Sequence, residues 1–505
     1  MEYRNPVISG FHPDPSLCRV GDDYYLVTSS FEYYPGVPLF HSKDLVHWEQ
    51  IGHCLTRQEQ LDLSKAWSSG GIYAPTIRYH QGTFYMTTTN VSSGGNLIVS
   101  ATDPRGEWSD PIWVDQPGID PDLFFDEDGT VYYSTSWDGE GQGIYQSRID
   151  LATGKRLSDI KLLWRGSGGQ FPEAPHLYRI GDWYYLLIAE GGTEYGHMVT
   201  IARSERPDGP FESCPSNPIL THRSLRKPIH ATGHADFVQT QDGEWWAVFL
   251  GIRPAGYPMR HHLGRETFLA PVAWTEDGWP IIGDNGTVDE VMPAGNLALQ
   301  PLPAPAVRDH FEGEALTPSW VFLRTPVSEN WSLTEQPSSL TLHGSPLTLN
   351  DAGALTFVGR RQQHFACSVS VQLNFSPQQD GEEAGLTVYM NERFHYEIAL
   401  TRAGGESKVI FRRRVGSLWK VEQEAPWEAE SIIFTIEADQ EHYGFGFAAD
   451  EQQEIRWLGQ GECSLLATEV AGGFTGVMMA MYATGNGVQS QTPAHFDWFD
   501  YEVAE

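Results

Sequence analysis

The first half of the chain repeats one pattern of strand-forming and turn-forming positions five times. Each copy has two short segments typical of strands, joined by a turn that holds a glycine, and an aromatic pair follows the turn closely. The first aromatic residues of successive copies are 60, 48, 52 and 61 residues apart. A repeat of this length built from strands is typical of a β-propeller, so we predict five blades. The glycines are Gly21, Gly82, Gly129, Gly181 and Gly243, and the pairs are Tyr24-Tyr25, Phe84-Tyr85, Tyr132-Tyr133, Tyr184-Tyr185 and Trp245-Trp246.

The pattern changes after a proline-rich stretch at residues 292–305, which we interpret as a linker. From Cys367 to Phe375, apolar side chains alternate with polar ones, as in a strand with one buried face. Similar short strands are expected near residues 396–400, 409–413 and 432–436. We therefore predict an all-β protein with a five-bladed β-propeller at residues 1–300 and a β-sandwich at 301–505.

The repeats also align the residues at the entrance of each blade's inner strand. Alignment on the aromatic pairs makes Asp14, Ala74, Asp120, Ala174 and Ala235 equivalent, with Glu173 and His234 one residue earlier. Inner strands surround the propeller axis, so we expect three carboxylates and a histidine to gather at one end of it. The alanines leave room beside the acids.

Three clustered carboxylates suit glycoside hydrolysis. That reaction needs a protonated acid for the leaving oxygen and an ionised carboxylate on the opposite face of the sugar. A third carboxylate can raise the pKa of the acid by like-charge repulsion. Aspartates and glutamates are also common in surface turns, but turn chemistry does not require three of them to share one blade register.

Composition narrows the range of partners. The net charge is −33, from 66 acidic and 33 basic residues, which argues against nucleic acids and against anionic membrane surfaces. A small neutral oligosaccharide is compatible with this charge. The aromatic content of 12% supports large packed cores and supplies apolar ring faces for sugars.

The cysteines and the N-terminal sequence bear on the compartment. The five cysteines are widely spaced and form no CxxC pair, so zinc and thiol-redox motifs are not expected. The first blade motif begins almost at Met1, no signal peptide is recognised, and no apolar run approaches the roughly 20 residues of a membrane span. We expect a cytoplasmic protein.

At these residues the chain resembles glycoside hydrolase family 43, in particular its β-xylosidase and α-L-arabinofuranosidase members. The resemblance extends over the whole chain as an ordered set of short matches. They lie at residues 5–7, 11–16, 29–32, 35–37, 41–45, 70–75, 172–178, 189–193 and 263–266. The resemblance implies a concanavalin-type sandwich after the propeller, and it suggests a homo-oligomer.

The resemblance also implies an inverting mechanism with three carboxylate roles. Asp14 matches the general base that activates water, and Glu173 matches the general acid that protonates the departing oxygen. Asp120 matches the third acid, which tunes the pKa of Glu173 and orients it. Inversion predicts carboxyl groups of Asp14 and Glu173 about 6.5–9.5 Å apart.

Further residues match the family's sugar pocket. Phe31 is expected to form a wall of the pocket, with a packed core position as the alternative. Tyr73 stands where close relatives often carry tryptophan, and it retains a face for stacking on a sugar. Arg265 matches an arginine that reaches substrate hydroxyls, the alternative being a solvated arginine. Thr193 matches a polar pocket residue and equally fits a local turn.

Two positions stay open at this point. His234 either binds substrate, faces an axial calcium or water site, or is a core histidine. No carboxylate-rich loop for calcium is evident, so we predict no metal ligands and no required cofactor, with calcium at the propeller axis as the alternative. Phe474 is our candidate for a sandwich loop that closes the active site, with a sandwich-core position as the alternative.

The leading hypothesis is an inverting exo-glycosidase that releases D-xylose from the non-reducing ends of β-1,4-xylo-oligosaccharides. Its nearest rival is α-L-arabinofuranosidase activity, alone or together with xylosidase activity. A retaining fructosidase-like mechanism is disfavoured because the Asn-Asp-Pro-Asn-Gly motif is missing. A non-catalytic sugar-binding propeller is disfavoured because a lectin needs no acid/base pair.

Overall fold

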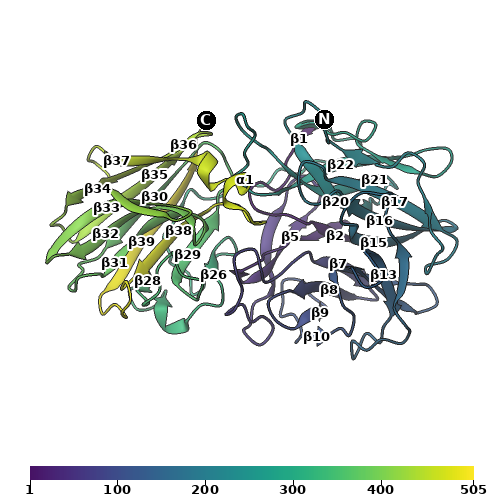
Figure 1. Cartoon of the computed structure of the whole chain (residues 1–505), viewed down its shortest axis with the longest axis horizontal. Coiled ribbons are helices and arrows are strands. Elements are labelled where there is room, and N and C mark those ends of the chain that lie inside the picture. Colours follow the sequence, from purple (N-terminus) through teal and green to yellow (C-terminus); the bar gives the residue numbers. More distant parts are fainter. Residues whose placement is uncertain (505) are drawn as a thin grey trace.

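Five antiparallel sheets surround a central axis in the first part of the chain. The structure is a computed structural model that describes residues 1–504 (Figure 1). Chain order and spatial order agree within each blade, from the innermost strand outward. The blades are β2 (Ser16–Val20), β3 (Asp23–Val27), β5 (Gly36–Ser42) and β6 (Glu49–Leu55); β7 (Thr76–His80), β8 (Thr83–Asn90), β9 (Gly95–Ala101) and β10 (Ile112–Trp113); β11 (Ile119–Phe125), β12 (Val131–Trp137), β13 (Gly143–Arg148) and β14 (Lys161–Trp164); β15 (Glu173–Ile180), β16 (Trp183–Glu190), β17 (Met198–Ser204) and β18 (Glu212–Ser213), with β19 (Leu220–Thr221) also on β17; and β20 (His230–Gln239), β21 (Trp245–Ile252), β22 (Glu266–Trp274) and β23 (Pro280–Ile282).

The repeated glycine turns join the two innermost strands of every blade. All five glycines have positive φ, between 60° and 87°, a conformation that glycine adopts without the steric penalty of a side chain. The aromatic pairs lie on the second strands, β3, β8, β12, β16 and β21. The innermost strands β2, β7, β11, β15 and β20 contact one another around the axis. The predicted five-bladed propeller is confirmed.

The N-terminal segment closes the ring of blades. Strand β1 (Glu2–Arg4) pairs with β24 (Val291–Pro293), which follows the fifth blade. The Asn5 side chain donates to the carbonyl of Leu269 on β22 (2.9 Å) and accepts from the amide of Leu269 (2.9 Å). The first residues of the chain are therefore hydrogen-bonded to its last blade.

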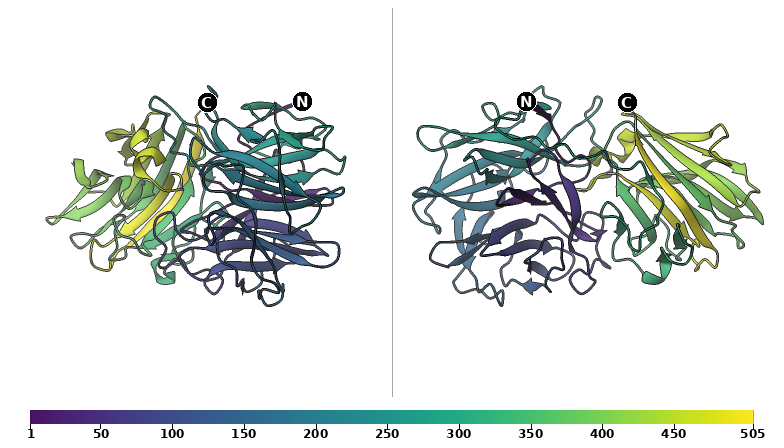
Figure 2. Two further views of the ribbon diagram at one scale, coloured as in Figure 1. Left: turned by 45° about the vertical axis from the view of Figure 1, so that its right-hand side comes forward. Right: turned by 180° about the vertical axis from the view of Figure 1, so that it is seen from behind.

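Two eight-stranded antiparallel sheets form the second part of the chain. It stands against one side of the propeller in every view (Figures 1 and 2). The first sheet contains β27 (Trp331–Ser332), β28 (Leu340–His343), β39 (Pro493–Val503), β30 (Cys367–Asn374), β35 (Ser431–Ala438), β36 (His442–Ala448), β37 (Arg456–Glu462) and, on β39, β25 (Arg308–Asp309). The second contains β34 (Leu418–Pro426), β33 (Glu406–Val415), β32 (Phe394–Ala403), β31 (Glu383–Asn391), β38 (Met478–Thr484), β29 (Thr356–Arg361), β26 (Val321–Leu323) and β4 (Tyr33–Tyr34).

Helical structure within residues 1–504 is limited to short turns. These are η1 (Ser328–Asn330), η2 (Cys463–Leu466) and α1 (Thr468–Ala471). None has the length and apolar character to cross a bilayer. The alternation expected from Cys367 onward is the observed burial pattern of β30, in which every second side chain is buried. The predicted β-sandwich is confirmed.

The propeller and the sandwich share a sheet. Strand β4 belongs to the first blade's connection, yet Tyr33 and Tyr34 pair with Leu323 and Phe322 at the edge of the sandwich. Apolar side chains from the first two blades and from the sandwich form one continuous core. The linker strands on either side, β24 and β25, end at Pro293 and begin at Arg308, so the expected division at residue 300 falls between them.

A buried ion cluster lies on the sheet of β31, β32, β33 and β38. Arg412 on β33 donates to Glu383 (Nη1 to Oε2, 3.1 Å) and to Glu397 (Nε to Oε2, 3.0 Å), and Tyr482 donates to Glu383 (2.8 Å). Both glutamates are almost fully buried. Removal of one partner from such a cluster leaves an uncompensated buried charge.

We expect Arg412→Leu to lower the free energy of unfolding by about 3–5 kcal/mol, because both glutamates lose their cation. Lys408→Leu is the matched control on the same strand. Its partner Glu424 is 57% exposed, so the loss should stay below about 1 kcal/mol. Denaturation midpoints in urea measure both effects, and equal shifts for the two variants would contradict the assignment.

Candidate active site

In the first, third and fourth blades, a left-handed residue at the start of the inner strand redirects the chain into the axis. Asp14, Asp120 and Ala174 have φ of 57°, 52° and 54°, and the ladder is irregular at this point in the third and fourth blades. Regular pairing resumes two residues later in each case. Such bulges re-aim side chains and store backbone strain at functional sites. Here they direct Asp14, Asp120 and Glu173 into one pocket.

The fifth blade corrects one detail of the repeat alignment. His234, rather than Ala235, has the left-handed conformation (φ 51°), and pairing resumes two residues later at Asp236. Ala235 is instead buried in the propeller core. Gln239 pairs with Trp245 across a five-residue turn, whereas the first, second and fourth blades have two-residue turns at this place, so a count back from the aromatic pair is displaced by one residue.

The pocket is a cavity of about 100 Å³ at one end of the propeller axis. It brings together all nine residues expected from the sequence, and Ala74 and Ile119 complete its lining. The nine are Asp14, Asp120, Glu173, Phe31, Tyr73, Thr193, His234, Arg265 and Phe474. Propeller and sandwich residues therefore share one small cavity.

Arg265 connects several of these residues. Its Nη1 donates to Asp14 Oδ1 (2.8 Å) and to Thr193 Oγ1 (3.0 Å). Its Nη2 donates to the backbone carbonyl of Phe474 (3.3 Å). The side chain is 7% exposed, so the expectation of a freely solvated arginine is excluded. Asp14 also accepts from Ser29 Oγ (2.5 Å).

Three aromatic rings form one wall of the cavity. The Phe31 ring lies 5.4 Å from Tyr73 and 6.0 Å from Phe474, centroid to centroid. Phe31 is 2% exposed whereas Phe474 is 39% exposed. The sandwich-core position considered for Phe474 is therefore not observed, and its ring contributes an apolar face to the cavity.

The carboxylates differ in their electrostatic surroundings. Burial would raise the pKa of Asp14, but Arg265, His234 and Ser29 outweigh it and lower that pKa below its usual range. Burial raises the pKa of Glu173 well above its usual range, and the charges of Asp120 and Asp14 raise it further. The pKa of Asp120 is also raised, by burial and by Asp14. At neutral pH the cavity can thus hold an ionised Asp14 beside a protonated Glu173.

His234 lies beside Asp14. Its Nδ1 is 3.6 Å from Asp14 Oδ1, and burial lowers its pKa to about 4. A neutral imidazole offers one donor and one acceptor to a hydroxyl-rich ligand. This position fits substrate binding better than a closed core.

An ion layer lies immediately below the cavity. Arg78 on β7 donates to Asp236 Oδ2 on β20 (2.8 Å) and to Asp122 Oδ1 on β11 (2.8 Å), and it contacts His176 Nδ1 on β15 (2.9 Å). Ser16 Oγ on β2 donates to Asp236 (2.6 Å). Each innermost strand contributes to this layer, so we call Ser16, Arg78, Asp122, His176 and Asp236 the axial layer.

The axial layer does not fit the calcium alternative. Calcium takes six to eight oxygen ligands, whereas the carboxylates of Asp122 and Asp236 are already paired with the guanidinium of Arg78. Within residues 1–504, no group of three or more His, Cys, Asp or Glu side chains is arranged to hold a metal ion.

The sandwich loop that carries Phe474 is fastened to the propeller. The amide of Phe474 donates to Ser69 Oγ (2.8 Å). A Cβ on Gly476 would lie 2.4 Å from the carbonyl oxygen of Leu263, so only glycine permits this approach to the Arg265 loop.

Glu469 on α1 adds a polar latch between the sandwich and the propeller. It accepts from the amide of His261 (2.9 Å) and from Tyr195 OH (2.8 Å), and it contacts His261 Nδ1 (2.7 Å). Burial opposes ionisation of Glu469, but the His261 and Tyr195 contacts lower its pKa to about 2. The charged form therefore holds the two loops together.

The axial layer and the latch were not found from the sequence. Asp122 and His176 lie two residues after recognised positions, so strand alternation could have indicated them. Tyr195, His261 and Glu469 meet only through tertiary packing, and no local signal links them.

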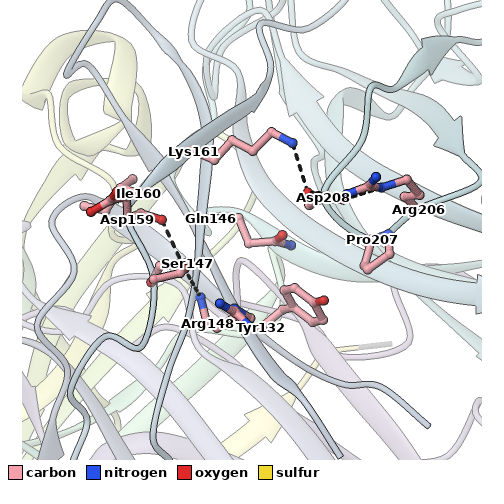
Figure 3. A pocket seen from close by; sticks show the side chains of 11 residues that line it. Tyr132, Gln146, Ser147, Arg148, Asp159, Ile160, Lys161, Arg206, Pro207 and Asp208 are labelled. Atoms are coloured by element: carbon pink, nitrogen blue, oxygen red, sulfur yellow. Dashed lines mark hydrogen bonds and ion pairs between the residues drawn. The ribbon is translucent and has the colours of Figure 1, made fainter. Parts of the chain in front are cut away.

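A wider groove is lined by residues of the third and fourth blades and by none of the three pocket carboxylates (Figure 3). It has a volume of about 680 Å³ and is lined partly by Tyr132, Arg148 and Arg206. Lys161 and Arg206 pair with Asp208 across it. Two of its three cations thus share one aspartate, and the raised-pKa carboxylates Asp120 and Glu173 lie in the axial pocket instead.

Comparison with known proteins agrees with this geometry. The family described as glycosyl hydrolases family 43 matches residues 3–280, and the beta xylosidase C-terminal concanavalin A-like domain matches residues 308–502. A non-reducing end alpha-L-arabinofuranosidase of Bacteroides ovatus is 45% identical over 100% of this chain and 95% of its own length. A xylosidase/arabinosidase of Butyrivibrio fibrisolvens is 39% identical over 99% of each chain.

Solved structures show the same architecture. The crystal structure of a xylan beta-1,4-xylosidase from Bacillus halodurans superposes with a TM-score of 0.93 and 33% identity, over 99% of this chain and 100% of that one. The propeller and the sandwich therefore both have counterparts in one relative. The chain belongs to glycoside hydrolase family 43 and carries that family's concanavalin-type C-terminal domain.

Proposed function

We propose that this glycoside hydrolase is an inverting exo-glycosidase that releases D-xylose from the non-reducing ends of β-1,4-xylo-oligosaccharides. The proposal rests on two carboxyl groups in one cavity whose surroundings shift their pKa values in opposite directions. Asp14 has a lowered pKa beside Arg265, and Glu173 has a raised pKa in the same cavity. Such a pair suits a base and an acid that act on one glycosidic bond.

In the proposed mechanism, Asp14 removes a proton from water as the water attacks the anomeric carbon. Glu173 donates its proton to the departing glycosidic oxygen, and the products are a pentose of inverted configuration and a shortened oligosaccharide. Asp120 keeps the pKa of Glu173 high and orients it. Arg265, Thr193 and His234 bind sugar hydroxyls, while Phe31, Tyr73 and Phe474 contact the apolar face of the ring.

Release of terminal α-L-arabinofuranose is the second candidate activity. The 45% identical relative is a non-reducing end alpha-L-arabinofuranosidase, and the 39% identical one is a xylosidase/arabinosidase. A cavity of about 100 Å³ suits a single pentose. Both activities would use the same carboxylates. The cytoplasmic location and a homo-oligomeric state stay predictions.

The first test is proton NMR of a xylobiose digest. We expect α-xylose to form first, and we expect Asp14→Ala to lower its rate about 100- to 10,000-fold through loss of the base. Asp22→Ala, on the exposed first-blade turn, is the control. Early β-xylose would refute inversion. Cleavage of an aryl α-L-arabinofuranoside without cleavage of xylobiose would favour the second activity.

The pH dependence of kcat/KM tests the role of Asp120. The acidic limb should follow Asp14, which must be ionised, and the alkaline limb should follow Glu173, which must be protonated. The charge of Asp120 raises the pKa of Glu173. Asp120→Asn should therefore move the alkaline limb to lower pH by about 1 unit or more. An unchanged or upward-shifted limb would refute this role for Asp120.

The latch at Glu469 tests whether the sandwich closes the cavity. Glu469→Gln replaces a charge-assisted hydrogen bond with a neutral one, at a cost of about 1 kcal/mol. We expect KM for xylobiose to rise about 5-fold with a smaller change in kcat. Glu462→Gln, whose partner Arg413 lies on the sandwich surface, is the matched control. If both variants have wild-type KM values, closure does not depend on the latch.

A further inference from the structure

We propose that Phe171 is the platform for the leaving-group sugar, a binding subsite directly outside the pentose cavity. This inference rests on the proposed function, because it takes Glu173 as the group that faces the departing oxygen. Phe171 does not line the cavity itself. The ligand is the pyranose unit next to the cleaved bond.

Phe171 is near the proposed acid in the sequence and near the rim of the cavity in space. It precedes Glu173 by two residues. An ideal Cβ on Gly192 would lie 3.2 Å from the Phe171 ring, and Gly192 adjoins Thr193, which lines the cavity. The ring therefore lies at the rim on the side of the acid, where the leaving sugar must depart.

The exposure of Phe171 is unusual for its setting. Its side chain is 50% exposed, although phenylalanine is usually buried. Its backbone has φ 50°, in the left-handed region that costs energy for a bulky residue. Strain of this kind persists where the surrounding structure enforces it, often at ligand sites.

The surrounding loop holds Phe171 from both sides. The carbonyl of Gln170 accepts from the amide of Gly191 (2.7 Å), and the carbonyl of Pro172 accepts from Ser136 Oγ (2.8 Å). The fully buried carboxylate of Glu190 accepts from the amides of Ser167 (2.8 Å) and Gly169 (2.7 Å). The exposed ring is therefore preorganised, which lowers the entropic cost of binding.

The chemistry of the ring matches a pyranose. Aromatic rings offer a flat apolar face to the C–H side of a sugar, while the sugar's hydroxyl groups remain in water at this open rim. Stacking would hold the leaving group while Glu173 protonates the linking oxygen. A substrate without a second sugar gains nothing from this contact, and this difference makes the proposal testable.

The test compares xylobiose with xylosyl fluoride, whose leaving group is too small to reach Phe171. In Phe171→Ala, the ratio of kcat/KM for xylobiose to kcat/KM for the fluoride should fall about 10-fold, equivalent to about 1.4 kcal/mol. Phe171→Tyr should restore the ratio. Trp457→Ala removes a comparably exposed ring, 46% exposed on β37, and should leave the ratio at the wild-type value.

A parallel fall for both substrates would overturn the proposal, because it would show that Phe171 only supports the Glu173 loop. An unchanged ratio would overturn it as well. Calorimetry in a Glu173→Gln background gives a readout without turnover. There, Phe171→Ala should lower the preference for xylobiose over xylose about 10-fold, and equal preferences would refute the platform. Failure of the proposed function is distinct, since wild-type enzyme would then release no pentose from either substrate.

Discussion

The ion pairs between one arginine and two buried aspartates hold three inner strands of the propeller together around its axis. Arg78 extends from the second blade and contacts Asp122 of the third blade and Asp236 of the fifth. The aspartates are 1% and 0% exposed, so loss of the guanidinium would leave two uncompensated charges in the interior. Asp122 and Asp236 lie two residues after Asp120 and His234. The contacts that hold the blades together therefore also set where the pocket side chains lie along the propeller axis and the direction in which they point.

The second organising contact is between Arg265 and Asp14. The guanidinium of Arg265 lowers the pKa of Asp14, whereas the like charges of Asp120 and Asp14 raise the pKa of Glu173. Two chemically similar groups in one cavity therefore have different pKa values. The difference comes from neighbours and not from the carboxyl groups themselves. Because Arg265 also binds the carbonyl of Phe474, this electrostatic arrangement is joined to the sandwich loop.

The sequence predicts most of what depends on local pattern. Five glycine turns with aromatic pairs define the blades, and the shared register of Asp14 and Asp120 indicates the pocket. Contacts that form only in three dimensions could not be foreseen. The fifth-blade register depends on a longer turn between β20 and β21, which a count from the aromatic pair overlooks. The latch at Glu469 joins residues more than 200 positions apart, and the exposed ring of Phe171 is not distinguishable by sequence from a core phenylalanine.

The strand pair between β4 and β26 limits how such domains can be recombined in evolution. A sandwich transferred to another propeller would arrive with its edge strand unpaired unless the new first blade supplied a two-residue strand in the same register. An unpaired edge is prone to association with other chains. Tyr33 and Tyr34 would thus have to be inherited together with Phe322 and Leu323. The propeller and the sandwich of this chain are therefore expected to be inherited together as one unit rather than as separate domains.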